Sequence, residues 1–337
     1  MPARAVILGC AGPELSEGER RFFASADPWG FILFARNIRD PEQTRALTAA
    51  LRDCVGRDAP VLVDQEGGRV ARLRGPAWRE WAPALEECAG LPPEARARAM
   101  HLRYLLIAGE LREVGIDVNC APVLDLAREE THGVLRNRCY SGDPGEVALM
   151  GRAVAEGLLA GGVLPILKHM PGQGRAPLDS HEDLPRVEAG ADELEADFAP
   201  FRALADMPMA MSAHVVYRAL DPDRPATQSP RVIRLIREEI GFGGLLMTDD
   251  LSMRALRGGL GERAAAALGA GCDMVLHCDG VPEEMAAVVA ATPRLAGAAL
   301  ARSEAALALR RPAPADSAAH EAEYRALAAR VGTRAHA

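Results

Sequence analysis

The sequence of 337 residues has little that suggests a nucleic-acid or membrane partner. It contains no run of basic residues, its formal net charge is −8 and its pI is near 5.6, so no nucleic-acid-binding surface is predicted. It also lacks an apolar run of about 18 residues, which a membrane-spanning helix requires. Only about five apolar residues precede Cys10, fewer than the roughly 7–15 of a secretory signal. We therefore expect the first strand in this segment. No obligate protein partner is evident from the sequence.

Cysteine usage argues against a disulfide scaffold. The chain has seven cysteines, an odd number, and none of them forms a Cys-x-x-Cys pair. Several lie within apolar runs, where a free cysteine behaves as a small hydrophobic residue. This usage is typical of a reducing compartment, and we therefore predict a cytoplasmic protein.

The sequence does contain a repeated alternation. Eight short apolar runs are each followed by a polar or glycine-rich segment and then by a helical pattern. Such continuous apolar runs are typical of parallel strands that are buried on both faces. The runs are residues 5–8, 30–34, 60–63, 115–119, 164–167, 207–212, 244–247 and 273–276, and the helical patterns include residues 41–55, 93–114, 144–160, 191–205 and 231–240.

Eight strands alternating with helices favour an α/β fold, a single (β/α)8 barrel of the TIM type, over an open doubly wound sheet. No Gly-x-Gly-x-x-Gly motif follows the first apolar run, so a dinucleotide-binding fold is not supported. The segment from about residue 293 is predicted to form closing helices, interrupted near Pro312 and Pro314. Because no linker is visible, the prediction is one barrel domain that spans residues 1–337.

Polar side chains gather directly after several of the apolar runs. They are Asp64, Lys168, His169, His214 and Asp249. In a barrel these positions share the rim formed by the carboxyl ends of the strands, where catalytic residues lie. A single Asp after a strand is more often a helix N-cap. That explanation weakens for a group of polar residues spread over the ends of different strands.

The segment that the rest of the chain is organised around is residues 164–185. Lys168 and His169 follow the fifth apolar run, and a loop interrupted by Pro and Gly leads to Asp179 and His181. In an extended loop residues i and i+2 point the same way. The Asp179 carboxylate could then fix the tautomer of His181 and make it a general acid–base near neutral pH. A loop histidine with a chance acidic neighbour has the same spacing, and spacing alone favours that simpler interpretation.

Two acidic residues follow the seventh run. In one interpretation Asp249 points into the mouth of the barrel as a nucleophile, while Asp250 points away and caps or braces the segment, since side chains alternate along an extended chain. In the other, the two residues are a capping pair for a helix that begins near Leu251. Spacing does not decide between them.

The segment DQEGGRVARL, residues 64–73, follows the third run. Its two glycines allow close backbone approach, and Asp64 and Arg72 could hydrogen-bond neighbouring hydroxyls of a sugar. Arg138 is a further candidate contact. The plainer interpretation of these residues is a turn with solvated arginines.

Other kinds of site have weaker support. His169, His181 and His214, with Asp64 or Asp249, are residue types that bind metal ions. The spacings HxH and HExxH are both absent, so neither a metal ion nor a cofactor is predicted. A Ser–His–Asp hydrolase is disfavoured because there is no Gly-x-Ser-x-Gly elbow.

Taken together, these stretches resemble the glycoside hydrolase family 3 β-N-acetylhexosaminidases, specifically the single-domain bacterial cytoplasmic type that recycles cell-wall fragments. The matching segments follow one another over nearly the whole chain, and KH-x-PG-x-G followed by DSH is specific to this subgroup. They are GFILFARNIRDPEQ (30–43), VDQEGGRVARL (63–73), GIDVNCAPVLDL (115–126), LKHMPGQGRAPLDSHEDLP (167–185), MSAHVVYRALDPDRPATQS (211–229), GFGGLLMTDDLSM (241–253) and AGCDMVLHC (270–278).

The resemblance implies a retaining exo-β-N-acetylglucosaminidase that works through a covalent glycosyl-enzyme intermediate. It implies that Asp249 is the nucleophile and that His181, paired with Asp179, is the acid–base. The implied sugar-binding residues are Asp64, Arg72, Arg138, Lys168 and His169.

The implied substrate is a muropeptide, GlcNAc–1,6-anhydroMurNAc with or without its peptide, which loses its non-reducing terminal GlcNAc during peptidoglycan recycling. A β-N-acetylglucosaminide phosphorylase with the same nucleophile is the alternative. Gln173 stands where the family usually has a second histidine, and Met170 stands where Phe or Ile is usual. These departures affect the loop geometry and the pH optimum more than the class of reaction.

Overall fold

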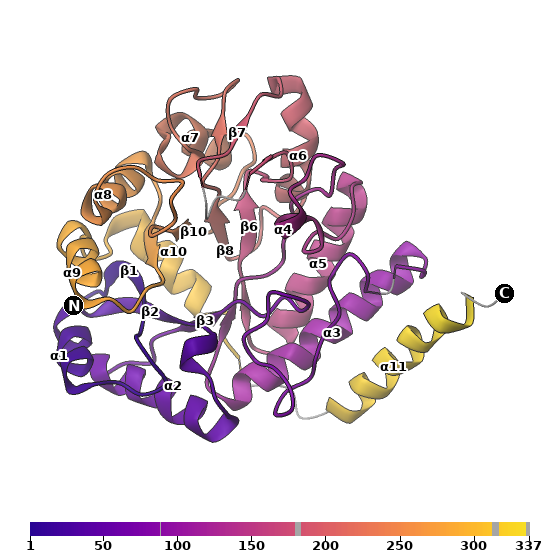
Figure 1. Ribbon diagram of the computed structural model, residues 1–337, viewed down its shortest axis with the longest axis horizontal. Helices are drawn as coiled ribbons and strands as arrows, with labels where there is room; N and C mark the ends of the chain where they lie inside the picture. The colour runs from indigo at the N-terminus through magenta and orange to yellow at the C-terminus, as the bar shows by residue number, and fades with distance from the viewer. Residues whose placement is uncertain (88, 179–182, 312–316, 335–337) are drawn as a thin grey trace.

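A nine-stranded parallel sheet forms the centre of the molecule. The computed structural model describes residues 1–87, 89–178, 183–311 and 317–334. The strands are hydrogen-bonded in the order β5-β4-β3-β2-β1-β11-β10-β8-β6 (Figure 1). Their bounds are β1 Arg4–Gly9, β2 Pro28–Leu33, β3 Val61–Val63, β4 Val118–Asn119, β5 Leu164–Pro165, β6 Leu167–Met170, β8 Met209–Ser212, β10 Leu245–Asp250 and β11 Met274–His277.

The sheet closes through the residues that join its two edge strands. β5 and β6 lie at opposite ends of the order, yet only Ile166 separates them in the chain. The Ile166 N–H donates to the carbonyl oxygens of Asn119 (3.1 Å) and Ala121 (2.9 Å), and Lys168 pairs with Val123 in a parallel bridge. The predicted (β/α)8 barrel is therefore confirmed, with the fifth apolar run divided into two short strands.

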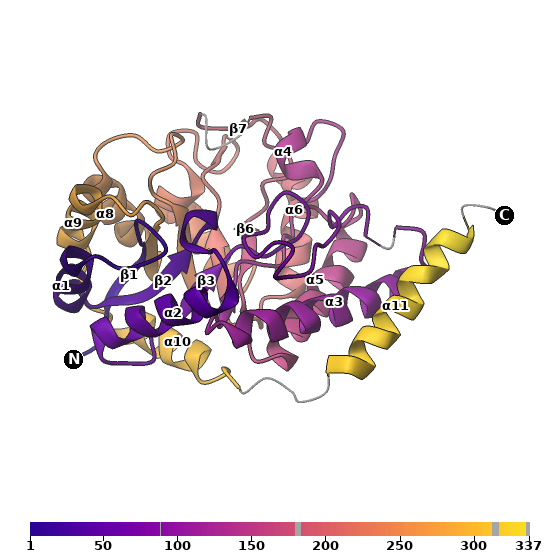
Figure 2. The same ribbon diagram turned by 60° about the horizontal axis from the view of Figure 1, so that its bottom comes forward.

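Eleven α-helices occur in the described part of the chain, and most of them surround the barrel (Figures 1 and 2). The side chains of Asp40, Asp143 and Ser229 each accept a hydrogen bond from the backbone N–H three residues later, and a proline follows each cap. The helices are α1 Glu17–Ala26, α2 Pro41–Val55, α3 Pro93–Glu113, α4 Gly133–Arg136, α5 Pro144–Ala160, α6 Ala191–Ala203, α7 Pro230–Glu238, α8 Leu260–Ala270, α9 Pro282–Ala291, α10 Gly297–Leu307 and α11 Ser317–Arg334.

The five predicted helical patterns correspond to α2, α3, α5, α6 and α7, with differences only at their ends. The predicted closing helices correspond to α10 and α11, whereas Pro312 and Pro314 lie outside the described residues. α11 runs beside α3 in both ribbon views (Figures 1 and 2). The single-domain assignment for residues 1–337 stays a prediction. No described helix combines the length and apolar character needed to cross a bilayer.

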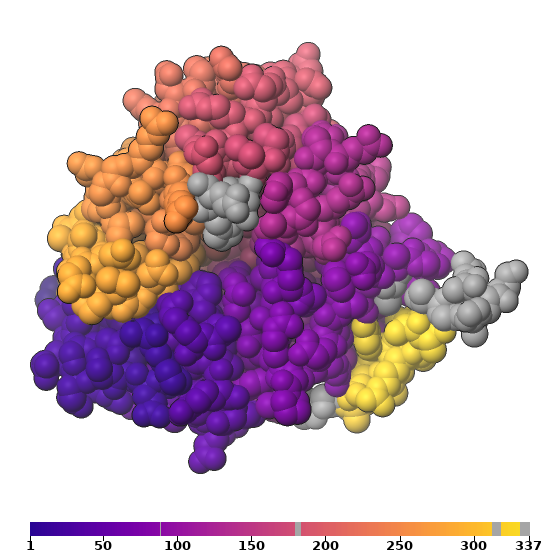
Figure 3. All heavy atoms as spheres, viewed as in Figure 1, coloured from indigo at the N-terminus to yellow at the C-terminus, as the bar shows by residue number. Residues whose placement is uncertain are grey.

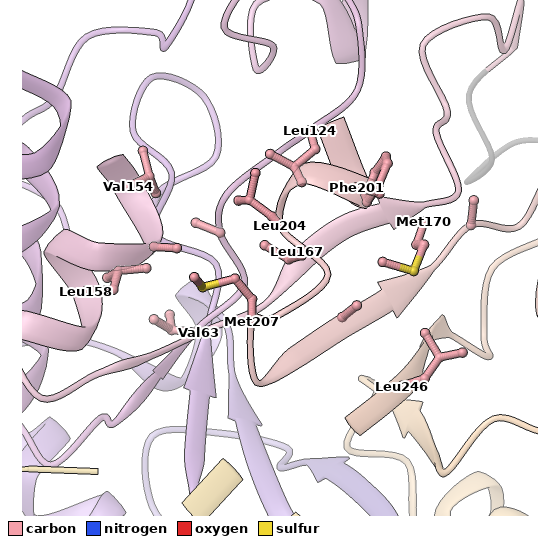
Figure 4. Close-up of a cluster of buried hydrophobic side chains, with 14 of the residues drawn as sticks. Val63, Leu124, Val154, Leu158, Leu167, Met170, Phe201, Leu204, Met207 and Leu246 are labelled. Atoms are coloured by element: carbon pink, nitrogen blue, oxygen red, sulfur yellow. The ribbon is translucent and has the colours of Figure 1, made fainter. Parts of the chain in front are cut away.

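The strands are apolar along their whole length because both of their faces are buried. In β1, Ala5 and Ile7 belong to a cluster inside the barrel, whereas Val6 and Leu8 pack outwards under the helices. Figure 4 shows part of this outer cluster, where side chains from the strands meet those of α5 and α6. Full burial of each aliphatic side chain contributes about 1.5–3 kcal/mol to the stability of the fold. These two apolar layers therefore stabilise the strands whose ends carry the rim residues.

The sequence did not predict a small second sheet, because each of its strands has only two residues. β7 (Arg186–Val187) pairs with β9 (Val216–Tyr217). Val216 also donates its N–H to the carbonyl of Pro185 at 3.0 Å. The far end of the loop that follows β6 is thereby attached to the segment after β8.

Candidate active site

A cavity of about 310 Å³ lies at the carboxyl ends of the barrel strands. Its inner wall is formed by apolar side chains of the barrel, namely Ile32, Met211 and Leu276. The cavity brings together six of the predicted site residues, which come from the ends of β3, β6 and β10 and from two loops: Asp64, Arg72, Arg138, Lys168, His169 and Asp249. The other two, Asp179 and His181, lie outside the described residues.

A buried network of ion pairs forms one side of the cavity. The Lys168 ammonium donates to Asp64 Oδ1 at 2.8 Å and lies 2.6 Å from Glu66 Oε1. Arg138 binds the same Glu66 carboxylate with two nearly parallel hydrogen bonds of 2.9 Å, from Nε and Nη2. Arg72 Nη2 donates to Asp64 Oδ2 at 3.1 Å. Two acids and three bases therefore share one polar cluster, which we call the binding cluster.

The charges of the binding cluster stabilise one another. Burial alone raises the pKa of the Glu66 carboxyl, but the cations of Arg138 and Lys168 outweigh burial and hold it at about 2. The pKa of Asp64 is likewise below its ordinary value, because Lys168 and Arg72 overcome the effect of burial. Burial lowers the pKa of Lys168, yet the two carboxylates raise it above the usual lysine value. Asp64, Glu66 and Lys168 are therefore charged at neutral pH.

Glu66 is the important residue that the sequence analysis missed. Its side chain is almost fully buried and contacts two of the predicted sugar-binding cations, Arg138 and Lys168. A signal was present, because Glu66 follows Asp64 by two positions and residues i and i+2 of an extended segment point the same way. The acidic pair Asp-x-Glu after a strand thus marks the cluster better than Asp64 alone.

Arg72 is placed by a loop that is fastened to the barrel. The Gln65 side chain accepts from the backbone N–H groups of Arg72 (2.8 Å) and Leu73 (3.1 Å) and donates to the Leu73 carbonyl (2.9 Å). Gln65 is itself held by Asn119 at the end of β4. The Arg72 guanidinium also lies 5.2 Å from the centre of the Phe34 ring, a cation–π contact at the cavity wall.

His169 is held by a buried carboxylate. Its Nδ1 lies 2.7 Å from Asp125 Oδ2, and Asp125 is fully buried. Asp125 Oδ1 accepts from the backbone N–H of Gln173 at 2.6 Å, so the same carboxylate also fixes the start of the following loop. A carboxylate at one ring nitrogen fixes the tautomer and orientation of an imidazole. Asp125 was not among the site residues predicted from the sequence.

Both strands that carry the central polar residues are irregular at that point. Between β6 and β8, Leu167 pairs with Ala210 and Met170 with Ser212, so three steps on β6 match two on β8. Between β10 and β11, Met247 pairs with Met274 and Asp250 with Leu276, which is the same mismatch. Such irregularities re-aim side chains and are over-represented next to active sites. The peptide bonds Lys168–His169 and Met170–Pro171 are cis.

Asp249 and Asp250 both line the cavity, so the cavity lining does not separate them, but their carboxylates make different contacts. Asp249 lines the cavity, and its Oδ1 accepts from the Asp250 N–H at 2.8 Å. The Asp250 carboxylate accepts from the backbone N–H groups of Ser252 and Cys278, both at 3.1 Å, and from the Ser252 hydroxyl. Asp250 thus braces the segment, and Asp249 presents a carboxylate to the cavity.

The family can be named on this geometry together with the comparisons. The Glycosyl hydrolase family 3 N terminal domain matches residues 16–306 of the chain. The chain belongs to glycoside hydrolase family 3. It is similar to the beta-hexosaminidase of Alkalilimnicola ehrlichii, with 41% identity over 295 residues that cover 86% of this chain and 84% of the relative. The beta-hexosaminidase of Pseudomonas aeruginosa LESB58 is 39% identical over 280 residues, 82% of each chain.

Solved family 3 structures have the same fold. Native NagZ from Neisseria gonorrhoeae superimposes with a TM-score of 0.83 at 32% identity, covering 99% of this chain and 98% of that one. A family 3 beta-N-acetylglucosaminidase from Paenibacillus sp. str. FPU-7 gives a TM-score of 0.82 at 31% identity, covering 97% of this chain and 66% of that one. The protein is thus a glycoside hydrolase of family 3.

In this family 3 barrel, Gln173 is nearly buried in the cavity wall. Its backbone N–H contacts Asp125, and the Tyr217 hydroxyl donates to the carbonyl of Gly172 at 2.8 Å. Both contacts are made to the main chain. They place the first part of the loop whatever side chain stands at position 173, so replacing the usual histidine changes the lining of the cavity rather than the path of the chain.

His214 lies behind the cavity rather than in it. Its Nε2 is 2.9 Å from the carbonyl oxygen of Asp250, and its Nδ1 is 2.9 Å from Thr227 Oγ1. Because a carbonyl only accepts, Nε2 carries a proton. Burial lowers the pKa of this imidazole, so the ring is neutral near pH 7. Both nitrogens face protein partners, which argues against His214 as a metal ligand and makes it a support for Asp249.

Within the ranges that the structure describes, no three His, Cys, Asp or Glu side chains are arranged to hold a metal ion. His169 uses Nδ1 to contact Asp125, and Asp64 is engaged with Lys168 and Arg72. The charged side chains of the binding cluster are thus paired with one another.

Proposed function

We propose that the protein is a retaining exo-β-N-acetylglucosaminidase that acts on muropeptides. It removes the non-reducing terminal GlcNAc from GlcNAc–1,6-anhydroMurNAc, with or without the peptide, through a glycosyl-enzyme intermediate. The observation that carries this proposal is the single cavity in which the Asp249 carboxylate lies with Asp64, Lys168 and Arg138. The inner end of the cavity is apolar barrel core, which favours a terminal sugar over the middle of a chain.

The binding cluster suits the hydroxyl and acetamido groups of an aminosugar. Asp64 offers carboxylate oxygens as acceptors, while Arg72, Arg138, Lys168 and His169 offer N–H donors. Because the ion pairs already hold these groups in place, sugar binding costs little reorganisation. One further observation supports this class of sugar: Neisseria gonorrhoeae NagZ, solved with N-trifluoroacetyl-D-glucosamine, has a TM-score of 0.83 and 32% identity to this chain, covering 99% of it and 98% of that chain.

In the first step, an Asp249 oxygen forms a bond to the anomeric carbon as the bond from that carbon to the aglycone oxygen breaks. The electron pair goes to the aglycone oxygen, which takes a proton from His181. In the second step, a water molecule attacks the same carbon, gives a proton to His181 and releases Asp249. Two inversions retain the anomeric configuration. The roles of His181 and Asp179 rest on the motif in the sequence, because both lie outside the described residues.

The same proposal includes the biological setting. The cysteine usage and the NagZ-like relatives support a cytoplasmic enzyme of peptidoglycan recycling. A small sugar or muropeptide is then its only required partner. The proposed substrates are fragments with a peptide and fragments without one. The kinetics of the two are measured separately.

The test is hydrolysis of GlcNAc–1,6-anhydroMurNAc, with and without peptide, next to a chromogenic aryl β-N-acetylglucosaminide. We expect release of free GlcNAc as the β-anomer first, seen by NMR, with no effect of a chelator. Addition of phosphate is expected to leave the product unchanged; a GlcNAc phosphate product would instead identify a phosphorylase. Turnover of the aryl substrate without turnover of either muropeptide would overturn the substrate assignment and leave the enzyme class intact.

A further inference from the structure

The C-terminal helix α11 contacts the segment that leads from the binding cluster to α3. The Tyr324 ring packs edge-on against Trp81, with 5.4 Å between ring centres and an angle of 72°. Glu321 pairs with Arg79 at 3.2 Å. In the space-filling view, the yellow surface of α11 adjoins the purple surface of this part of the chain (Figure 3). α11 follows the part of the chain that the family domain matches, residues 16–306.

A continuous line of hydrogen bonds runs from α11 to the binding cluster. The Tyr324 hydroxyl donates to Glu87 Oε1, and Glu87 Oε2 accepts from Arg103 Nη1 at 2.7 Å. Arg103 Nη2 in turn donates to the carbonyl oxygen of Glu66 at 2.6 Å. Glu87, Arg103 and Glu66 are all buried, and Arg103 has no exposed surface. Hydrogen bonds to charged groups in such surroundings are stronger than those in water.

Glu66 is the point where this line reaches the binding cluster. Its backbone carbonyl is held by Arg103 and by the Tyr104 hydroxyl, which donates at 3.1 Å. Its carboxylate binds Arg138 and Lys168. The contacts from α11 therefore fix the main chain of the residue whose side chain orders both cations.

Packing around Arg103 leaves no room for adjustment. Gly67 has a φ of +101°, and a Cβ atom at this position would lie 1.9 Å from Arg103 Nη2. The Arg103 guanidinium also lies 5.4 Å from the Trp81 ring centre and 5.7 Å from that of Tyr104. Because closely packed interiors transmit displacements, a shift at Glu87 is passed on to Glu66.

We propose that α11 is a positioning element of the active site: Tyr324, acting through Glu87 and Arg103, sets the position of Glu66 and thereby of Arg138 and Lys168. Tyr324, Glu87 and Arg103 do not line the cavity. They therefore act through Glu66 and do not touch the sugar. The proposal rests on the sugar-binding roles of the two cations given under the proposed function.

The first test compares two substitutions on the same helix. Tyr324→Phe keeps the ring against Trp81 and removes only the hydroxyl. Glu323→Gln is the matched control, because Glu323 pairs with the exposed Arg98 through two bonds of 2.7 Å that do not lead to Glu66. We expect Tyr324→Phe to raise KM for an aryl β-N-acetylglucosaminide about three- to tenfold with kcat little changed, and Glu323→Gln to change neither.

Two further variants separate positioning from general stability. Arg103→Lys keeps a cation beside Glu87, but a single ammonium cannot span both Glu87 and the Glu66 carbonyl as a guanidinium does, so a larger rise in KM is expected. In a Glu66→Gln background, Tyr324→Phe is expected to add little, since the side chain at position 66 then lacks the charge that pairs with Arg138 and Lys168. Thermal unfolding midpoints are recorded for every variant.

Equal changes in KM for Tyr324→Phe and Glu323→Gln, or no change in either, would overturn the proposal. So would a full Tyr324→Phe effect in the Glu66→Gln background. Calorimetric affinity for N-acetylglucosamine provides a second readout that needs no turnover. A wild-type enzyme that binds the sugar but does not hydrolyse the aryl substrate would refute the proposed function, while the affinity series would still decide on α11.

Discussion

The two sides of the cavity are held in place by different means. On the binding side, Asp64, Glu66, Arg138 and Lys168 position one another through short ion pairs, and the Glu66 and Lys168 side chains are almost fully buried. On the reacting side, Asp249 is half-buried, and the backbone N–H of Asp250 orients it. Loss of a residue on the binding side is expected to disturb several partners at once, whereas a change at Asp249 is expected to remove the proposed nucleophile and to disturb its surroundings less.

The largest expected effect on activity comes from a substitution of Asp249 on the reacting side. We expect Asp249→Ala to lower kcat by about 10⁴-fold or more, because the neighbours of Asp249 cannot replace it in its proposed role as covalent nucleophile. The free energy of unfolding is expected to stay close to that of the wild type, since the side chain is half-buried and lies outside the binding cluster. Kinetics on an aryl β-N-acetylglucosaminide and urea unfolding measure the two quantities.

Asp250→Asn is the matched control for this prediction. Asp250 accepts hydrogen bonds from Ser252 and Cys278 and does not act on the sugar in the proposed mechanism. Its substitution is expected to reduce kcat far less than Asp249→Ala does. A larger loss for Asp250→Asn than for Asp249→Ala would reverse the assignment of the two carboxylates.

The second prediction concerns His181, the proposed proton donor. His181→Ala is expected to lower the rate on a substrate with a poor leaving group by about 10²–10⁴-fold, because general acid catalysis contributes that much. A nitrophenyl or similar good leaving group departs without a proton, so its first step is expected to suffer much less. Measurement of both substrates with the same variant gives the ratio. Similar losses on the two would argue against an acid role.

The sequence predicted which residues share the rim better than it predicted the partners that hold them in place. The eight apolar runs and the polar residues after them placed Asp64, Lys168, His169 and Asp249 on one rim, and the structure confirms that arrangement. Strand period and barrel topology suffice for this, because every strand end faces the same way. What the sequence did not show were the partners: Glu66 under Lys168 and Arg138, and Asp125 behind His169.

The pairings of these partners were not predictable because they join segments far apart in the sequence. Arg138 is 72 positions from Glu66, and Lys168 is 104 positions from Asp64. The irregular pairing of β6 with β8 and of β10 with β11 is likewise a property of two strands together. The sequence of one strand shows how its side chains alternate. The register shift that re-aims Lys168 and Asp249 depends on two neighbouring strands and is seen only in the folded barrel.

The third prediction concerns the binding side, where the Lys168 ammonium is removed. Lys168→Met is expected to lower the free energy of unfolding by about 3–5 kcal/mol, because it leaves two buried carboxylates short of a cation. Sugar affinity is expected to fall as well. The control is Arg152→Met, which removes an exposed pair with Asp206 and is expected to cost less than about 1 kcal/mol. Equal costs for the two variants would show that the binding cluster does not depend on mutual pairing.

The smallest expected effect is the pH dependence of the binding side. The pKa of Glu66 is about 2 in the folded protein, against an ordinary value of 4.5, because Arg138 and Lys168 outweigh burial. The unfolded chain therefore binds more protons than the folded one between these values, and folding is weakened as pH falls. The contribution of Glu66, on the order of 3 kcal/mol, is complete above about pH 5 and is lost as pH falls towards 2.

Glu66→Gln separates this contribution from the other carboxylates, because glutamine keeps the shape of the side chain and does not titrate. The variant is expected to be less stable than the wild type at pH 7, and the difference is expected to narrow steadily in urea unfolding at pH 5, 4 and 3. Asp249→Asn, on the reacting side, serves as the comparison, since its carboxylate is half-buried and lies outside the binding cluster. A difference between wild type and Glu66→Gln that is constant from pH 7 to pH 3 would mean that the cations of the binding side do not hold the charge of Glu66.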